Sequence, residues 1–153
     1  MARRQGAAGG EGARSRLKPV IAPFHDLAGA RAAVAFHRDA AALRLLTPSG
    51  AAGQAGPAYY WEILRRLKSD HPAIDVQGIL DCGDDAAMAH AALVMGWRDL
   101  VLSGKATARA RIAALAEERG ATVRARRPKV MQDTDMQTIV SSLAATVSDA
   151  KDN

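Results

Sequence analysis

One stretch of the chain places residues that can do chemistry at the end of a predicted strand. The apolar run 76–80 stops at a stretch in which three carboxylates flank a thiol and a glycine, Asp81-Cys82-Gly83-Asp84-Asp85. An alanine-rich helical pattern follows over residues 86–95. A buried parallel strand delivers polar groups to the edge of a sheet in this way. Asp81 lies on the strand itself, where a carboxylate needs either a partner or a function.

The neighbours of Asp81 have structural interpretations. Asp84 or Asp85 suits the N-cap or first turn of the next helix, where a carboxylate stabilises the helix by about 1 kcal/mol. Nearby carboxylates disfavour a thiolate, so we interpret Cys82 as a small buried residue. A single cysteine excludes an internal disulfide, and the four histidines show no ligand spacing. We therefore predict neither a metal site nor a cofactor.

Two loops carry groups that could bind an anion. The glycine-rich loop 50–56 opens a helix, and its permissive backbone could hold a phosphate or a carboxylate. A second helix begins after residue 104, with a lysine as counter-charge. Neither loop is a complete P-loop. The predicted ligand-binding residues are Gly50, Gly53, Asp84, Ser103, Gly104 and Lys105.

Strands and helices that alternate along the chain must position these groups. The predicted strands cover residues 19–24, 42–46, 76–80, 99–102 and 122–126, and the predicted helices cover residues 27–40, 58–69, 84–95, 106–119 and 134–150. Such alternation indicates a parallel sheet with right-handed crossovers. We predict a three-layer αβα sandwich of five βα units, with five parallel strands in a doubly wound, flavodoxin-like order. A half-barrel that closes by dimerising is the alternative.

The chain divides into a disordered basic tail (1–18), an α/β core (19–128) and a C-terminal segment (129–153). The last segment is predicted to form an amphipathic helix that packs on the domain or on a partner. The net charge is +5, but the tail alone holds five basic residues and one acidic residue. We therefore expect nucleic acid to bind weakly at most, through the tail.

Hydropathy favours a cytoplasmic protein. No apolar stretch approaches the roughly 20 residues that span a bilayer. Residues 1–18 lack the apolar region of a secretory signal. We therefore expect no membrane association.

Four positions resemble the site of response-regulator receiver domains. Asp26 follows the first strand, Asp81 ends the third, Ser103 ends the fourth and Lys129 follows the fifth. They are similar to that family's acidic, phospho-acceptor, hydroxyl and lysine positions, and the resemblance implies phosphorylation of Asp81. Only one carboxylate follows the first strand here, and the lysine comes after its proline rather than before it.

A shorter resemblance covers residues 80–83. The sequence Leu-Asp-Cys-Gly is similar to the Leu-Asp-His-Gly strand end of class II aldolase barrels. Cys82 stands where those enzymes have a metal-binding histidine, and the chain is too short for a full barrel. Neither resemblance identifies a family.

The leading hypothesis is a binding or regulatory module whose crevice, at the carboxyl ends of the strands, takes a small anion or a protein partner. One alternative is a small lyase or hydrolase acting on an anionic molecule, with Asp81 as general base and His25 as its acid–base partner. Another is a structural subunit that self-associates through the helix 134–150 or through Tyr59 and Trp61.

Overall fold

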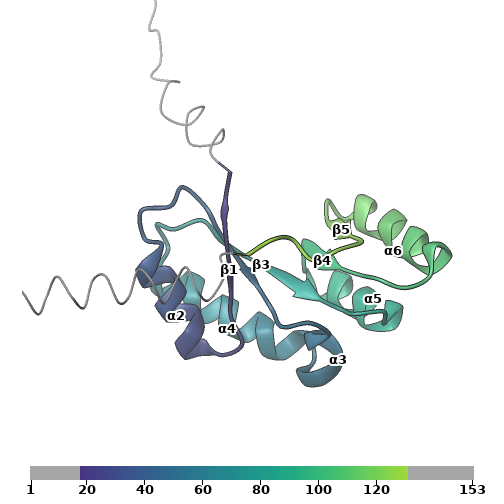
Figure 1. The fold of residues 1–153 in the computed structure, drawn as a ribbon, viewed down its shortest axis with the longest axis horizontal. Coiled ribbons are helices and arrows are strands. Elements are labelled where there is room, and N and C mark those ends of the chain that lie inside the picture. Colours follow the sequence, from purple (N-terminus) through teal and green to yellow (C-terminus); the bar gives the residue numbers. More distant parts are fainter. Residues whose placement is uncertain (1–17, 131–153) are drawn as a thin grey trace, which may run out of the picture.

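The computed structural model of the protein describes residues 18–130. The elements along this range are β1 (Val20–Pro23), α2 (Leu27–Phe36), β2 (Leu43–Leu46), α3 (Ala51–Ala55), α4 (Pro57–Asp70), β3 (Val76–Asp81), α5 (Ala86–Met95), β4 (Asp99–Val101), α6 (Ala106–Glu118) and β5 (Thr122–Arg124) (Figure 1). The predicted basic tail, apart from Lys18, and the predicted helix 134–150 lie outside the described residues.

The five strands form one sheet in which all four pairings are parallel. The predicted α/β fold, with five parallel strands and helices between them, is confirmed. The strands follow one another along the sheet in the order β1-β2-β3-β4-β5. This order differs from the flavodoxin-like one, in which β1 lies between β2 and β3.

The sequential order decides where the helices lie. A right-handed crossover that always moves to the next position in the sheet places its helix on the same face each time. The helices accordingly contact one another in sequence, α2 with α4, α4 with α5, and α5 with α6. One large core cluster combines their side chains with those of all five strands. The other side of the sheet carries no described helix, and we refer to it as the open face.

The helices begin and end at residues suited to those positions. Asp26 Oδ1 accepts a hydrogen bond from the Gly29 N–H (2.6 Å), and Asp85 Oδ1 accepts one from the Met88 N–H (3.0 Å). Asp26 and Asp85 are therefore the N-caps of α2 and α5, and Asp85 is one of the two residues that the sequence indicated for the second cap. Pro57 occupies the first turn of α4. No helix within residues 18–130 is both long and apolar enough to cross a membrane.

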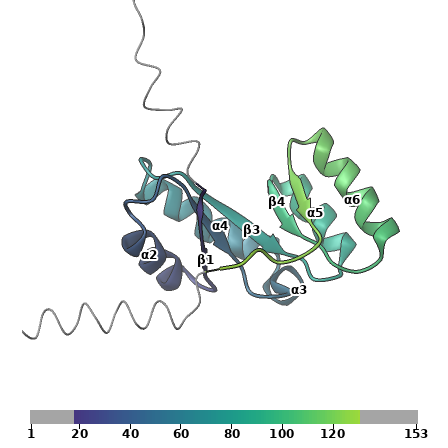
Figure 2. The ribbon, with the colours of Figure 1, turned by 45° about the horizontal axis from the view of Figure 1, so that its top comes forward.

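A short segment after β5 covers the middle of the open face. This closing segment, residues 125–130, leaves β5 and runs back towards β1 (Figures 1 and 2). Its Val130 packs against a second, smaller core cluster formed by Leu46, Ile79 and Val101. These three side chains are at most 3% exposed, although no described helix covers them.

Gly78 on β3 tests how closely α4 and Trp97, which follows α5, pack on the sheet. A Cβ atom there would lie 2.3 Å from Leu64 Cδ1 and 2.7 Å from Trp97 Cζ3. We expect Gly78→Ala to lower the free energy of unfolding by about 1–3 kcal/mol, because the core must open to admit one methyl group. Urea unfolding measures the change.

Gly53→Ala is the matched control, because no atom lies within 4 Å of a Cβ built at Gly53 in α3. This change should leave the stability unchanged or raise it by up to about 1 kcal/mol, owing to the better helix propensity of alanine. Equal effects of the two substitutions would contradict the close packing at Gly78.

Candidate functional site

Asp81 is buried at the carboxyl end of β3 and is fully paired. Its side chain is 3% exposed. Oδ1 accepts hydrogen bonds from the backbone N–H groups of Gly50 (3.0 Å) and Gly83 (2.8 Å), and Oδ2 accepts one from Arg127 Nη1 (2.6 Å). The backbone N–H of Asp81 donates to Thr47 Oγ1 (2.9 Å). These donors compensate the charge that burial would otherwise penalise.

Arg127 joins the closing segment to two strand ends. Its Nη1 also donates to the carbonyl oxygen of Thr47 at 3.0 Å, so the same nitrogen contacts the ends of β2 and β3. The side chain is 35% exposed. Its Nε and Nη2 groups form no hydrogen bond with another described residue. Part of a fixed guanidinium is therefore available to a ligand.

The loops after β2, β3 and β4 contact one another, as expected for the carboxyl ends of parallel strands. The Ser103 N–H donates to the Gly83 carbonyl at 2.7 Å. A Cβ atom on Gly104 would lie 3.1 Å from Asp84 Cβ, and one on Gly83 would lie 3.6 Å from Gly50 Cα. The structure thus brings together the segments that carry most of the predicted ligand-binding residues.

Within these loops the predicted residues have different surroundings. The N–H of Gly50 is already bonded to Asp81. Gly53 is exposed in α3, and Lys105 is exposed at the N-cap of α6. The Asp84 and Ser103 side chains are exposed as well. Ligand binding by these residues stays a prediction.

His25 and Asp81 have separate partners. His25 Nδ1 lies 3.2 Å from Asp26 Oδ2, and its side chain is 74% exposed. Within residues 18–130 no hydrogen bond or ion pair joins His25 to Asp81. General base catalysis by Asp81 would require a carboxylate oxygen that is not already held by Arg127 or by backbone donors.

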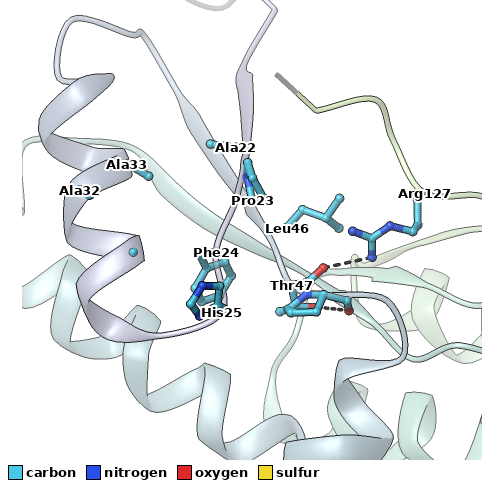
Figure 3. Close-up of a pocket in the computed structure, with 11 residues that line it drawn as sticks. Ala22, Pro23, Phe24, His25, Ala32, Ala33, Leu46, Thr47 and Arg127 are labelled. Carbon is cyan, nitrogen blue, oxygen red and sulfur yellow. Dashed lines mark hydrogen bonds between the residues drawn. The ribbon is translucent and has the colours of Figure 1, made fainter. Parts of the chain in front are cut away.

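A cavity of about 450 Å³ lies at the carboxyl ends of β1 and β2, between α2 and the closing segment (Figure 3). Most of its wall is apolar, and its polar groups come from His25, Thr47 and Arg127. In Figure 3 the guanidinium of Arg127 points towards Leu46 and Thr47. The lining residues are Ala22, Pro23, Phe24, His25, Gly29, Ala32, Ala33, Leu46, Thr47, Pro48 and Arg127.

Cys82 is buried beside Asp81, as the sequence predicted. Burial, together with the negative charges of Asp81 and Asp85, raises the pKa of its thiol to about 12. The thiol is therefore not a nucleophile at neutral pH. Within residues 18–130 no group of three or more histidine, cysteine, aspartate or glutamate side chains could hold a metal ion.

No protein-family model matches the chain, and no curated protein matches it. The structure of the chain also differs from that of the receiver domains, whose site four of its residues resemble. Receiver domains have the flavodoxin-like strand order, which this sheet does not have. Asp81, the position similar to their phospho-acceptor, is paired with Arg127 rather than with Lys129.

Sequence reasoning did not assign the roles of Thr47 and Arg127. Three arginines at the end of the last strand, at positions 124, 126 and 127, were a signal of concentrated positive charge. They could not be told apart by sequence. Arg124 forms a bidentate pair with Asp99 on β4, and Arg127 pairs with Asp81. Only the second lines the cavity.

Removing the Arg127 side chain should show how much the ion pair between Arg127 and Asp81 contributes to the free energy of unfolding. Arg127→Ala leaves the Asp81 carboxylate buried with backbone donors alone, so we expect unfolding free energy to fall by about 2–3 kcal/mol. The neighbouring Arg126→Ala changes an exposed side chain and should have an effect within about 0.5 kcal/mol. Urea unfolding of both variants gives the comparison.

A double substitution identifies the cause. Adding Asp81→Asn to Arg127→Ala removes the uncompensated charge, so part of the lost stability should return. If Arg127→Ala were as stable as Arg126→Ala, the ion pair would not be holding the closing segment in place.

Native Cys82 should resist thiol reagents. At pH 8 a thiol with a pKa of about 12 is ionised in roughly one molecule in ten thousand, and this one is also buried. We expect Ellman's reagent to label it only as the protein unfolds in urea. A Cys82→Ser variant that also carries Ser69→Cys, an exposed position on α4, should react at once. Rapid labelling of the native protein would show that the turn after β3 opens readily.

Proposed function

We propose that the protein is a small binding module that takes an organic anion into the cavity at the carboxyl ends of β1 and β2. The strongest support is the state of Arg127. Its Nη1 is fixed by Asp81 and Thr47, while Nε and Nη2 form no hydrogen bond with another described residue. A guanidinium held in this way offers a rigid fork to a carboxylate or a phosphate.

The shape of the cavity supports a ligand with an apolar body. Its volume of about 450 Å³ falls within the range of roughly 300–1,000 Å³ that small-molecule sites occupy. Ala22, Phe24, Ala33 and Leu46 supply an apolar wall, and His25 adds a ring nitrogen at its rim. We therefore expect an anionic group at Arg127 and an apolar group against α2.

Binding is favoured over catalysis because Asp81 is occupied. An enzyme of the lyase or hydrolase type would use Asp81 as general base, and the three donors on its carboxylate oppose that role. In a binding module the same contacts have a purpose, since they orient Arg127 before the ligand arrives.

Thermal unfolding with matched probes tests the proposal. Benzoate should raise the melting temperature by a few degrees at concentrations far above its dissociation constant, and benzyl alcohol, which has the same ring without a charge, should not. Arg127→Lys should weaken the benzoate effect, because lysine can retain the charge near Asp81 but has no second N–H edge. His25→Ala should weaken it as well.

Arg126→Ala is the control for general electrostatic attraction, since Arg126 is exposed and does not line the cavity. It should bind benzoate as the unaltered chain does. Equal responses to benzoate and benzyl alcohol, or a benzoate response that survives in Arg127→Lys and His25→Ala, would refute an anion site at this cavity. Calorimetric titration with phenyl phosphate extends the test to the phosphate class.

A further inference from the structure

Two adjoining cavities lie at the other edge of the sheet, where the strands begin. They measure about 110 Å³ and 100 Å³ and share Trp61, Leu64 and Lys68 as lining residues. Gly78, Trp97 and Arg98 complete the larger one, together with Gln77 and Gly96. We refer to this pair of cavities as the tryptophan site. It shares no lining residue with the cavity at Arg127.

The tryptophan site is built by close packing around two indole rings. Trp61, Leu64 and Lys68 follow one another at helical spacing along α4, so they share one face. The rings of Trp61 and Trp97 lie 5.5 Å apart at 58°. A Cβ atom on Gly96 would come within 3.1 Å of Trp61, and one on Gly78 within 2.7 Å of Trp97. The absence of side chains at both glycines makes room for the rings.

One polar group at this site has no partner. Trp97 is 2% exposed, and its Nε1–H has no hydrogen-bond acceptor among the described residues. Buried donors are satisfied in the great majority of proteins, and this one is itself enclosed, so a ligand could accept from it only by displacing neighbouring side chains.

Positive charge surrounds the aromatic rings. Lys68 and Arg98 are exposed, and neither forms an ion pair with another described residue. Arg65, which lines the smaller cavity, pairs with Glu62. Two acidic residues lie close to the lining residues in sequence. Asp75, before β3, pairs with Arg44, and Asp99, next to Arg98, pairs with Arg124.

We infer that the tryptophan site binds the base-and-phosphate unit of a nucleotide, either free or within a single strand. A base can stack on the face of Trp61 while its phosphate contacts Lys68 and Arg98, which is how proteins hold unpaired nucleotides without reading their sequence. The larger cavity, of about 110 Å³, is too small to enclose a whole nucleotide, so the base would lie against its mouth and the phosphate outside it. This inference does not depend on the anion site at Arg127.

The protein provides its own probe for this site. Trp61 and Trp97 are the only two tryptophans in the chain, so tryptophan fluorescence reports on this site alone. The full chain is titrated with uridine monophosphate, with adenosine monophosphate and with a ten-nucleotide strand of deoxythymidine, excited at a wavelength where the probes do not absorb. We expect saturable quenching. Quenching by the mononucleotides identifies a free nucleotide as sufficient, and quenching by the strand alone identifies single-stranded nucleic acid.

Substitutions locate the binding. Trp61→Leu should weaken it at least about fivefold, measured through Trp97 fluorescence and by calorimetry, because one stacking surface is lost. Arg98→Glu should weaken nucleotide binding at low salt, since a phosphate contact is removed. The dissociation constant of this variant should also depend less on salt concentration. Arg111→Glu, an equal change of charge at an exposed position on α6, should leave nucleotide binding unchanged.

Three results would overturn the inference. The first is the absence of saturable quenching by any probe. The second is quenching that is the same in Trp61→Leu and in Arg98→Glu as in the unaltered chain. The third is that Arg98→Glu and Arg111→Glu weaken nucleotide binding equally. The last two would mean that nucleotides bind by general charge attraction or through the basic residues before position 19. Circular dichroism checks that Trp61→Leu is folded. If Trp61→Leu does not fold, the comparison of Arg98→Glu with Arg111→Glu decides whether nucleotides bind at the tryptophan site.

Discussion

The buried carboxylate of Asp81 is the interaction on which the carboxyl edge of this protein depends. A carboxylate can remain charged away from water only when donors surround it, and here they come from three separate parts of the chain. The donor from the loop after β2 is Gly50, the donor from the turn after β3 is Gly83, and the donor from the closing segment is Arg127. Because Arg127 is held in this way, Val130 reaches the open face and the cavity acquires its one fixed guanidinium.

Local pattern predicted the class of the fold and the cap of one helix, but not the order of the strands in the sheet. The cap of α5 could be placed at Asp84 or Asp85 because capping is decided within a few residues, and it is Asp85. Strand order depends on which strand each crossover connection pairs with next, and this choice is not encoded in the residues of a single strand or helix. One clue was present: Arg44, Gln77 and Asp99 interrupt the apolar strands, whereas strands covered on both faces are almost continuously apolar. That interruption fits a sheet with helices on one face.

The candidate site was predictable at one residue and not in its surroundings. Position alone marked Asp81 as a carboxylate that must have a partner or a function, and the structure gives it partners. The choice of Arg127 over Arg124 or Arg126 depends on the path of the chain after β5, and on Asp99 already pairing with Arg124. The same limit applies to Trp61 and Trp97. Their 36-residue separation in sequence gives no hint that their rings meet.

The ion pair between Asp81 and Arg127 also bears on where the folding unit ends. The last strand stops at Arg124, and a domain boundary drawn from secondary structure would fall there. A chain cut at that point would retain all five strands, yet it would bury a carboxylate without its counter-charge and leave Leu46, Ile79 and Val101 uncovered. In the folded protein the same Arg127 nitrogen also donates to the Thr47 carbonyl, so the closing segment is bonded to the ends of two paired strands, β2 and β3. A boundary that keeps this ion pair and this cover must therefore lie beyond the final strand, after the charge of Arg127 and the side chain of Val130.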